Sequence, residues 1–168
     1  NEDIAAAYAS IQRRVDALAV VHRNHYAELE ENRGVALKPL ISELASNLRA
    51  NAPAQAAGMQ IRFNVAPFHA TEDVAVSVAF LITEIVEFAM FCNARAVSIS
   101  LEGVEAGAAQ LAIESEALME ELHCDEKLTE RFERIVTGLS RQLRSNLERD
   151  PTRGCYMVRI SVVELVAP

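Results

Sequence analysis

The histidines and one glutamate, Glu84, are the residues of this chain whose types and positions could carry phosphoryl chemistry. A histidine accepts a phosphoryl group when its imidazole is exposed on a helix and a neighbouring carboxylate or amide orients it. His22 and His25 lie three residues apart in a stretch of helical periodicity. A packing role is the more common one for such a histidine, and for His22 phosphate acceptance or contact with an acceptor helix is the alternative. His69 and His123 lack a comparable setting and are interpreted as incidental.

Neither the histidines nor the cysteines predict a metal site. The i, i+3 pair His22 and His25 has no carboxylate or third ligand positioned with it. The cysteines, Cys92, Cys124 and Cys155, have neither CxxC spacing nor an even count. Such a set indicates thiols in a reducing, cytoplasmic setting more than a disulfide framework. We therefore expect no bound metal and a cytoplasmic location.

The composition predicts a soluble globular protein. Of the 168 residues, 51% are apolar, which is enough for one good-sized domain or a domain with a helical arm. A formal net charge of −8 argues against a nucleic-acid or anionic-membrane surface, because neutralising phosphates requires clustered Lys and Arg. The chain begins at Asn1 without a methionine and shows no signal peptide, which predicts a processed form or a fragment.

The longest apolar segment, residues 71–91, predicts the central helix of the core. Thr71 offers an N-cap hydroxyl, and Glu72 and Asp73 place carboxylates in the first turn, where the helix dipole favours them. Apolar residues then fall on nearly every side, which is typical of a helix buried on more than one face. Ser77 and Glu84 interrupt the apolar run, so we do not expect a membrane span.

A second helical pattern covers the first thirty residues and predicts a coiled-coil or bundle seam. A helix with one such stripe is marginal in water, so it needs a partner helix from the same chain, a second subunit or a missing segment. A simple packing helix is the alternative. The seam positions step by four and three: Ile4, Tyr8, Ile11, Val15, Leu18, His22, His25 and Leu29.

The remaining periodicities predict two more helices and four strands. The helices cover residues 37–48 and 125–147, and the strands cover 59–65, 97–102, a short stretch through 111–113 and 155 to about 165. Helices that alternate with a mixed, largely antiparallel sheet predict an α+β fold, a two-layer α/β sandwich preceded by a helical arm.

Residues 14–26, RVDALAVVHRNHY, resemble the second helix of the dimerisation and phosphotransfer region in one subfamily of bacterial sensor histidine kinases, with the pattern R-I-x-A-L-A-x-V-H-x-x-L-Y. His25 stands where leucine is usual. The element order that follows resembles the ATP-binding domain of those kinases, the Bergerat (GHKL-like) fold shared with gyrase and heat-shock chaperone ATPases. The resemblance implies that residues 1–33 are the second helix of a dimerisation bundle without its first helix, and that 34–168 are a degenerate ATPase-like domain.

Residues 83–89, TEIVEFA, stand at the place of the family's N box, roughly N-E-L-V-T-N-A. In the family, the last asparagine holds the magnesium ion that bridges the ATP phosphates. Here that position is Phe88, which offers no oxygen to a hard cation. Glu84 matches the acidic residue that the family uses near the attacking group, and we interpret it as a vestige.

The sequence also departs from the family at the family's two glycine-rich elements. Its D-x-G-x-G element, whose aspartate reads the adenine amino group, is replaced by ESEAL at residues 114–118. Between Gly107 and Gly138 there is no glycine, so the flexible lid is predicted to be lost, because backbone amides cannot close around phosphates as readily without glycine. Residues 135–143 and Gly154 still resemble the family's following helix and the glycine before its last strand.

The family's phosphoacceptor histidine lies on the first bundle helix, in a run like H-H-R-V-K-N-N. This sequence has no such run, so the acceptor is expected to precede Asn1. The resemblance implies a two-component protein that acts as a histidine phosphotransferase or as a docking scaffold for a response-regulator receiver, dimeric through its N-terminal helix, with no nucleotide cofactor. The alternatives are a divergent active kinase that keeps Glu84 as a catalytic residue, and a pseudokinase interaction module that transfers nothing.

Overall fold

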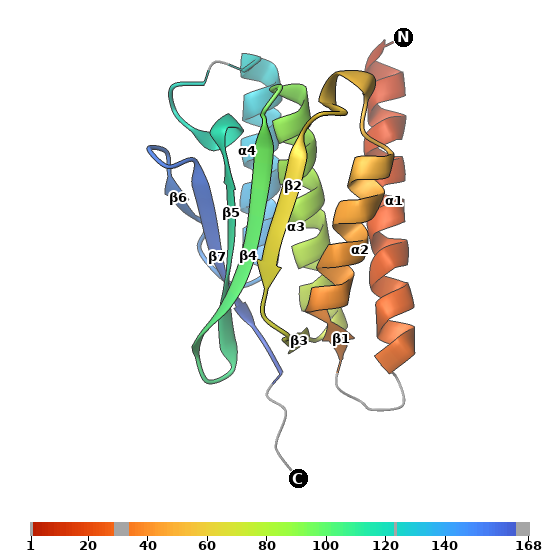
Figure 1. Cartoon of the computed structure of the whole chain (residues 1–168), viewed down its shortest axis with the longest axis vertical. Helices are drawn as coiled ribbons and strands as arrows, with labels where there is room; N and C mark the ends of the chain where they lie inside the picture. The colour runs from red at the N-terminus through yellow and green to blue at the C-terminus, as the bar shows by residue number, and fades with distance from the viewer. Residues whose placement is uncertain (1, 29–33, 123, 164–168) are drawn as a thin grey trace.

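The apolar segment after Thr71 forms α3 (Glu72–Phe91), the helix at the centre of the core (Figure 1). The computed structural model describes residues 2–28, 34–122 and 124–163. Thr71 is the N-cap through its backbone alone, because its hydroxyl makes no cap hydrogen bond, in contrast to the prediction. In the described part of the chain α3 is the one helix long and apolar enough to cross a membrane, and 78% of its apolar window is buried inside the protein. The core therefore uses the apolar surface of this helix.

A five-stranded mixed sheet forms one layer, in the order β2-β4-β5-β7-β6. The β2–β4 pair is parallel and the other pairs are antiparallel, which confirms the predicted mixed, largely antiparallel sheet. A separate antiparallel pair, β1–β3, lies at one end of the molecule. The strands are β1 (Val35–Ala36), β2 (Gln60–Val65), β3 (His69–Ala70), β4 (Ala96–Glu105), β5 (Ala108–Ser115), β6 (Glu148–Asp150) and β7 (Cys155–Ser161).

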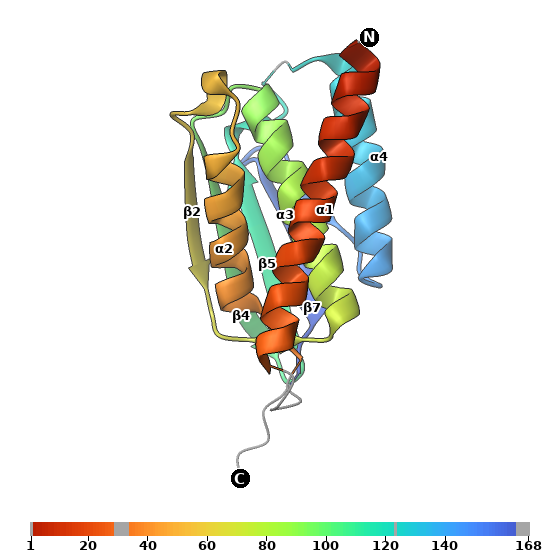
Figure 2. The ribbon, with the colours of Figure 1, turned by 90° about the vertical axis from the view of Figure 1, so that its right-hand side faces the viewer.

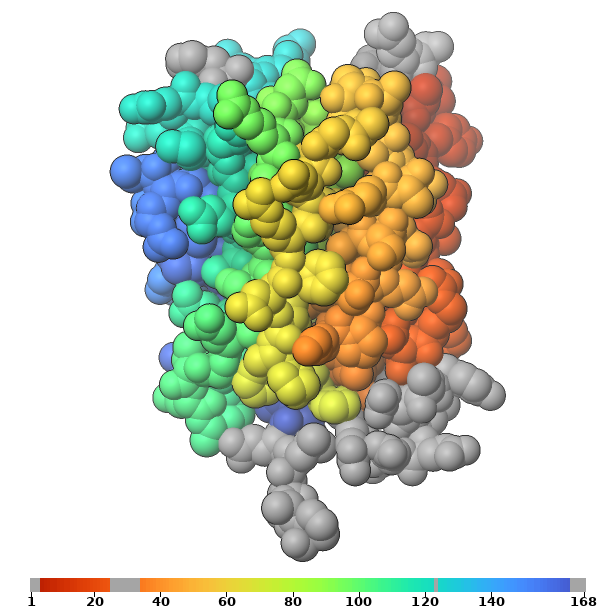
Figure 3. Space-filling model, viewed as in Figure 1, coloured from red at the N-terminus to blue at the C-terminus, as the bar shows by residue number. Residues whose placement is uncertain are grey.

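Helices α2 (Leu37–Ala50), α3 and α4 (Glu126–Gln142) lie side by side on one face of the sheet (Figure 2). Figure 3 shows β2 beside α2 at the edge of this sandwich. Two short 3-10 helices, η2 (Ala54–Ala56) and η3 (Glu116–Leu118), connect these elements. Alternating strand residues such as Val97, Ile99 and Leu101 are buried under the helices, as period-two patterning requires. The predicted α+β sandwich is confirmed.

The N-terminal helix α1 (Glu2–Glu28) lies outside the helical layer, across α3 (Figure 2). Ala17, Val20 and Val21 are buried against the rest of the chain, each no more than 1% exposed. The predicted seam points the other way, and its apolar members are 46–71% exposed: Ile4, Tyr8, Ile11, Val15 and Leu18. The helix therefore has one face packed in the chain and a second apolar face open. Leu29 lies outside the described residues.

Three details of the predicted elements are wrong. Helix α4 ends at Gln142, short of the predicted 147, because Arg144 takes a φ of +55° and turns the chain toward the edge strand β6. The closing strand ends at Ser161, and the last predicted residues, 164 and 165, lie outside the described part. His69 belongs to strand β3, where a loop was expected.

Candidate functional site

Helix α3 carries the residues that resemble an N box, and its neighbours cover them from two sides. The Thr83 hydroxyl donates to the carbonyl oxygen of Ala79 at 2.8 Å, so this side chain is satisfied within the helix. Glu84 and Glu87 contact α1, and Phe88 contacts α4. The candidate site is thus the α3 surface between α1 and α4.

Glu84 is held by an arginine of the N-terminal helix. Its carboxylate is 8% exposed and accepts a hydrogen bond from Arg14 Nε at 3.1 Å. The Arg14 guanidinium also lies over the Phe80 ring, 5.7 Å from the ring centroid, a cation–π arrangement. The structure therefore places Glu84 in an ion pair within the chain. A carboxylate in this state has its charge neutralised by Arg14.

One turn along α3, Glu87 forms a second ion pair with α1, through Arg13. Burial disfavours the charged carboxylate and raises the pKa of Glu87 to about 7, although Arg13 partly opposes that rise and the nearby Glu84 adds to it. The sequence reasoning missed Arg13, Arg14 and Glu87. A usable signal was present, since adjacent arginines on one helix match two acids spaced by three on another.

Phe88 lies in an aromatic stack that joins α3, α4 and the sheet. Its ring lies parallel to Phe132 of α4, with centroids 4.0 Å apart and planes 4° apart, and Phe132 in turn stacks on Tyr156 of β7 at 6.0 Å. Burial, together with the hydrogen bond that the Tyr156 hydroxyl donates to Glu133, raises the pKa of Tyr156 above its usual range. Phe88 and Phe132 are about 5% exposed, so this stack is part of the core.

The space left between α1, α3 and α4 is small. A cavity of about 200 Å³ is lined mostly by apolar side chains such as Phe91, Leu128 and Ile135. The charged residues of its lining are Arg13, Arg131 and the ion-paired acids Glu84 and Glu87. Pockets for drug-sized ligands run to about 300–1,000 Å³. With phenylalanine at position 88, the cavity lacks the oxygen ligand that the family supplies to magnesium at that position.

Residues 114–118, which stand in place of D-x-G-x-G, form a turn that contains no glycine. The Ser115 hydroxyl accepts the amide of Ala117, and the Glu116 carboxylate accepts the amide of Arg95. Leu118 is buried beside Ala117. Helix α4 begins after its N-cap, Asp125, which accepts the Leu128 amide at 2.9 Å. The described part of this connection, residues 116–122 and 124–125, contains η3, and the sequence has no glycine there.

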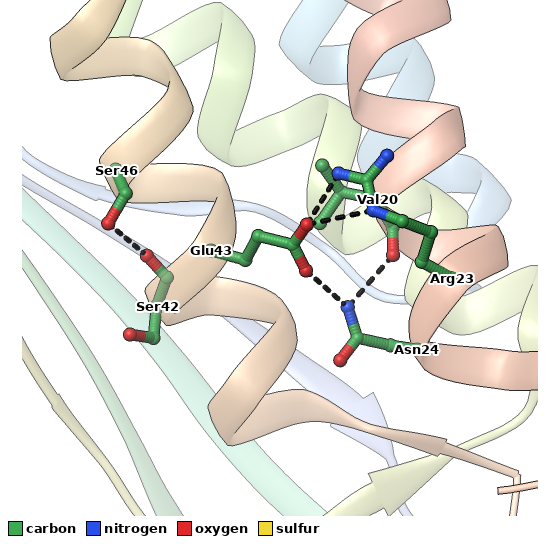
Figure 4. Close-up of polar contacts among 6 residues, drawn as sticks. All are labelled: Val20, Arg23, Asn24, Ser42, Glu43 and Ser46. Carbon is green, nitrogen blue, oxygen red and sulfur yellow. Dashed lines mark hydrogen bonds and ion pairs between the residues drawn. The ribbon is translucent and has the colours of Figure 1, made fainter. Parts of the chain in front are cut away.

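His22 is exposed on α1 and continues the line of the open apolar face. No hydrogen bond to its imidazole is found among the described residues. The polar residues that follow it tie α1 to α2 (Figure 4): Arg23 pairs with Glu43, and Asn24 donates to the other Glu43 oxygen at 3.1 Å. His25 lies in α1, its side chain outside the described part, and His123 lies wholly outside it.

The interpretation of the cysteines requires a correction. Cys92 and Cys124 form a disulfide, with Cα atoms 5.5 Å apart, and Cys155 is the free, buried one. The 32-residue separation gave no local signal, because the pair meets only after the sheet brings the end of α3 to the start of α4. Among the described residues, no cluster of three His, Cys, Asp or Glu side chains could hold a metal ion.

A mixed sheet covered on one face by three helices, with this connectivity, is the fold of histidine-kinase catalytic domains, the GHKL-like fold. The chain is similar to the blue-light activated histidine kinase EL346 of Erythrobacter litoralis, with a TM-score of 0.65 and 18% identity over 92% of this chain and 54% of that one. It is also similar to the histidine kinase AdeS of Acinetobacter baumannii, with a TM-score of 0.57 and 13% identity over 94% of this chain and 79% of that one.

The chain spans about half the length of the Erythrobacter kinase. A histidine kinase from Burkholderia phymatum is similar over 90% of this chain and 76% of its own, with a TM-score of 0.53 and 14% identity. No protein-family model and no curated protein matches the sequence. At these identities the similarity establishes the fold.

Proposed function

We propose that this chain is a two-component signalling protein whose kinase-like domain does not bind Mg-ATP, and that it exchanges phosphoryl groups with a response-regulator receiver or docks one. The observation that carries the proposal is the parallel stack of Phe88 on Phe132, at the position where the resembled kinases place a magnesium ligand. The proposed setting is the cytoplasm, where receivers of such pathways act.

Two further contacts support the absence of nucleotide chemistry. Arg14 holds Glu84, the only acid retained from the N box pattern, in an ion pair within the chain, so this carboxylate is already engaged by α1. In the glycine-free turn at η3 the Ala117 amide donates to the Ser115 hydroxyl, so that donor is not available to a phosphate.

The surface of α1 supports the signalling half of the proposal. Its open apolar face, Ile4, Tyr8, Ile11, Val15 and Leu18, has the alternating four and three spacing of a bundle seam, and His22 follows one turn later. We propose that this face forms a homodimer. In this arrangement the phosphoacceptor, or the docking surface for a receiver, is built on the bundle.

Thermal unfolding of the chain with and without millimolar Mg-ATP tests the loss of nucleotide binding. A ligand at about 100 times its Kd stabilises a protein by about 2.7 kcal/mol, which raises the Tm by several degrees at this size. We expect no shift beyond that produced by magnesium alone. A Tm that rises with Mg-ATP would instead support the divergent kinase, with Glu84 as a catalytic residue.

Phosphotransfer and docking are separated by a receiver that has been phosphorylated with acetyl phosphate. If the chain is a phosphotransferase with His22 as its acceptor, label moves from the receiver aspartate to an acid-labile phosphohistidine, and a His22→Gln variant abolishes the transfer. If it is a docking scaffold, the receiver binds with its label retained. A chain that neither binds nor dephosphorylates any receiver of its own cell would overturn the proposal.

A further inference from the structure

The disulfide between Cys92 and Cys124 joins the ends of the two helices that carry the aromatic stack. Cys92 is the C-cap of α3, one turn after Phe88, and Cys124 immediately precedes Asp125, the N-cap of α4. Both cysteines are half-buried, so a small thiol in solution can reach them. The bridge therefore lies at the surface end of the α3–α4 contact.

The first turns of α4 have few other attachments to the rest of the protein. Leu128 packs partly against the core, and the first fully buried residue is Phe132, one turn later. Between them the side chains of Thr129, Glu130 and Arg131 are half-buried or exposed. Below them lies the cavity between α1, α3 and α4. Among the described residues, the start of α4 is thus attached to the rest of the protein by Leu128 and by the bridge, whereas its N-cap bond stays within the helix.

We propose that Cys92 and Cys124 are a reversible thiol–disulfide modification site, which fixes the start of α4 on α3 when oxidised and releases it when reduced. The proposal rests on the cytoplasmic setting proposed above, because disulfides in that compartment are usually transient and redox-sensing. Low-molecular-weight disulfides such as glutathione disulfide are the class of oxidant.

The exchange is balanced without any other reactant. One cysteine thiolate attacks a sulfur of glutathione disulfide, forming a mixed disulfide and releasing one glutathione thiolate. The second cysteine thiolate then attacks the protein sulfur of the mixed disulfide, which forms the Cys92–Cys124 bond and releases a second glutathione. The two protons lost by the cysteines go to the two glutathione thiolates, and glutathione disulfide is reduced as the protein is oxidised.

Cys155 provides an internal contrast in the same chain. It is 2% exposed, and burial raises the pKa of its thiol, which lowers the thiolate fraction that reacts. It should remain unmodified in the folded protein in every redox buffer. Any change in reactivity therefore reports on Cys92 and Cys124.

The first experiment equilibrates the whole chain in buffers that range from mostly glutathione disulfide to mostly glutathione, and counts alkylated thiols by mass spectrometry. We expect both Cys92 and Cys124 to change together, with a midpoint inside the series that is the same from either direction. If the disulfide stays intact in glutathione alone, it is a structural disulfide. If it never forms in glutathione disulfide, the two cysteines are not a redox pair. Either result overturns the proposal.

The second experiment measures hydrogen exchange of the α4 amides in the oxidised and reduced protein. Reduction should speed exchange at residues 126–132 by at least about tenfold and leave the buried strands β4 and β5 unchanged. Cys92→Ser and Cys124→Ser variants should behave like the reduced protein in both buffers, and Cys155→Ala should behave like the wild type. Equal exchange in the two states would overturn the release of α4.

Both experiments use the chain by itself, with no nucleotide or receiver present. A failure of the proposed signalling function would leave their results unchanged, and a failure of the redox site would leave the receiver and Mg-ATP experiments unchanged.

Discussion

Glu87 is the buried acid whose protonation should make the stability of this protein depend on pH. Its pKa is about 7 in the folded chain, against an ordinary value of 4.5, because burial disfavours the carboxylate. The folded state therefore holds a proton that the unfolded state has lost between these two values. It follows that the stabilising contribution is complete below pH 4.5 and is lost as the pH rises through 7.

A Glu87→Gln variant should lack this dependence. Relative to that variant, the wild type should lose up to about 3 kcal/mol of unfolding free energy between pH 4.5 and 7.5, as the shift implies. Urea unfolding at a series of pH values measures the difference. Glu43→Gln, which removes another acid that pairs with an α1 arginine, is the matched control for the loss of such a pair. Parallel curves for wild type and Glu87→Gln would contradict the prediction.

Phe88 should contribute to stability as a core residue does, and restoring the family's asparagine should not restore nucleotide binding. Phe88→Asn removes a ring that stacks on Phe132 and buries an amide in its place, so we expect a loss of about 3 kcal/mol or more. Phe91→Asn, on the same helix but 49% exposed, should cost less than about 1 kcal/mol. Chemical unfolding tests both, and a gain of Mg-ATP binding by Phe88→Asn would show that the glycine-free turn is no obstacle.

The sequence identified individual residues that depart from the family pattern, but not the residues that they contact in the fold. The departure at Phe88 is visible in one segment, because the resemblance aligns that residue with a magnesium ligand. Its partner Phe132 lies 44 residues away and meets it only because α3 and α4 lie side by side on the sheet. Arg14 and Glu84 are likewise 70 residues apart, so their contact depends on how α1 crosses α3.

Helix α1 has one face packed against the chain and one exposed apolar face. Substitutions on the buried face test whether its packing holds α1 in place. Ala17 is 1% exposed against the rest of the chain, whereas Ala19 on the same helix is exposed. Ala17→Glu would bury an unpaired charge, so α1 should detach or unfolding free energy should fall by about 3 kcal/mol or more. Ala19→Glu, the same change two residues on, should stay within about 0.5 kcal/mol of wild type.

Hydrogen exchange of α1 amides distinguishes detachment from global loss of stability. If Ala17→Glu leaves both the α1 exchange rates and the unfolding midpoint unchanged, the packing of α1 on α3 is wrong.

Periodicity was sufficient for the long elements and failed for the short ones. Helices α1 to α4 and strands β2, β4, β5 and β7 each contain enough turns or alternations to define a period. Strands β1, β3 and β6 are two or three residues long and carry no period. Their pairing is set by neighbours, as when β6 adds to the edge of β7, so the end of α4 could not be placed from local pattern either.

Large apolar side chains along one face of α1 are exposed to solvent in the single chain, and we expect this face to form the interface between two copies. Each of Ile4, Tyr8, Ile11, Val15 and Leu18 is at least 46% exposed, although they lie on one face. Contiguous apolar surface of this kind marks an interaction site. In a two-fold symmetric dimer the same face meets itself, so each protomer buries the stripe of the other.

We therefore expect the chain to sediment as a dimer at micromolar concentration and an Ile11→Glu variant to sediment as a monomer. The reason is geometric, since two-fold symmetry places the substituted carboxylate in the seam twice and both charges would be desolvated. Ala5→Glu adds the same charge to an exposed site beside the stripe and should remain a dimer. Ile11 is 60% exposed in the single chain, so its substitution should not alter the unfolding of the monomer. A variant that loses the dimer and keeps the fold would therefore assign the exposed apolar face of α1 to dimerisation. A wild type that stays monomeric, or an Ile11→Glu variant that stays dimeric, would leave this face without the role proposed for it.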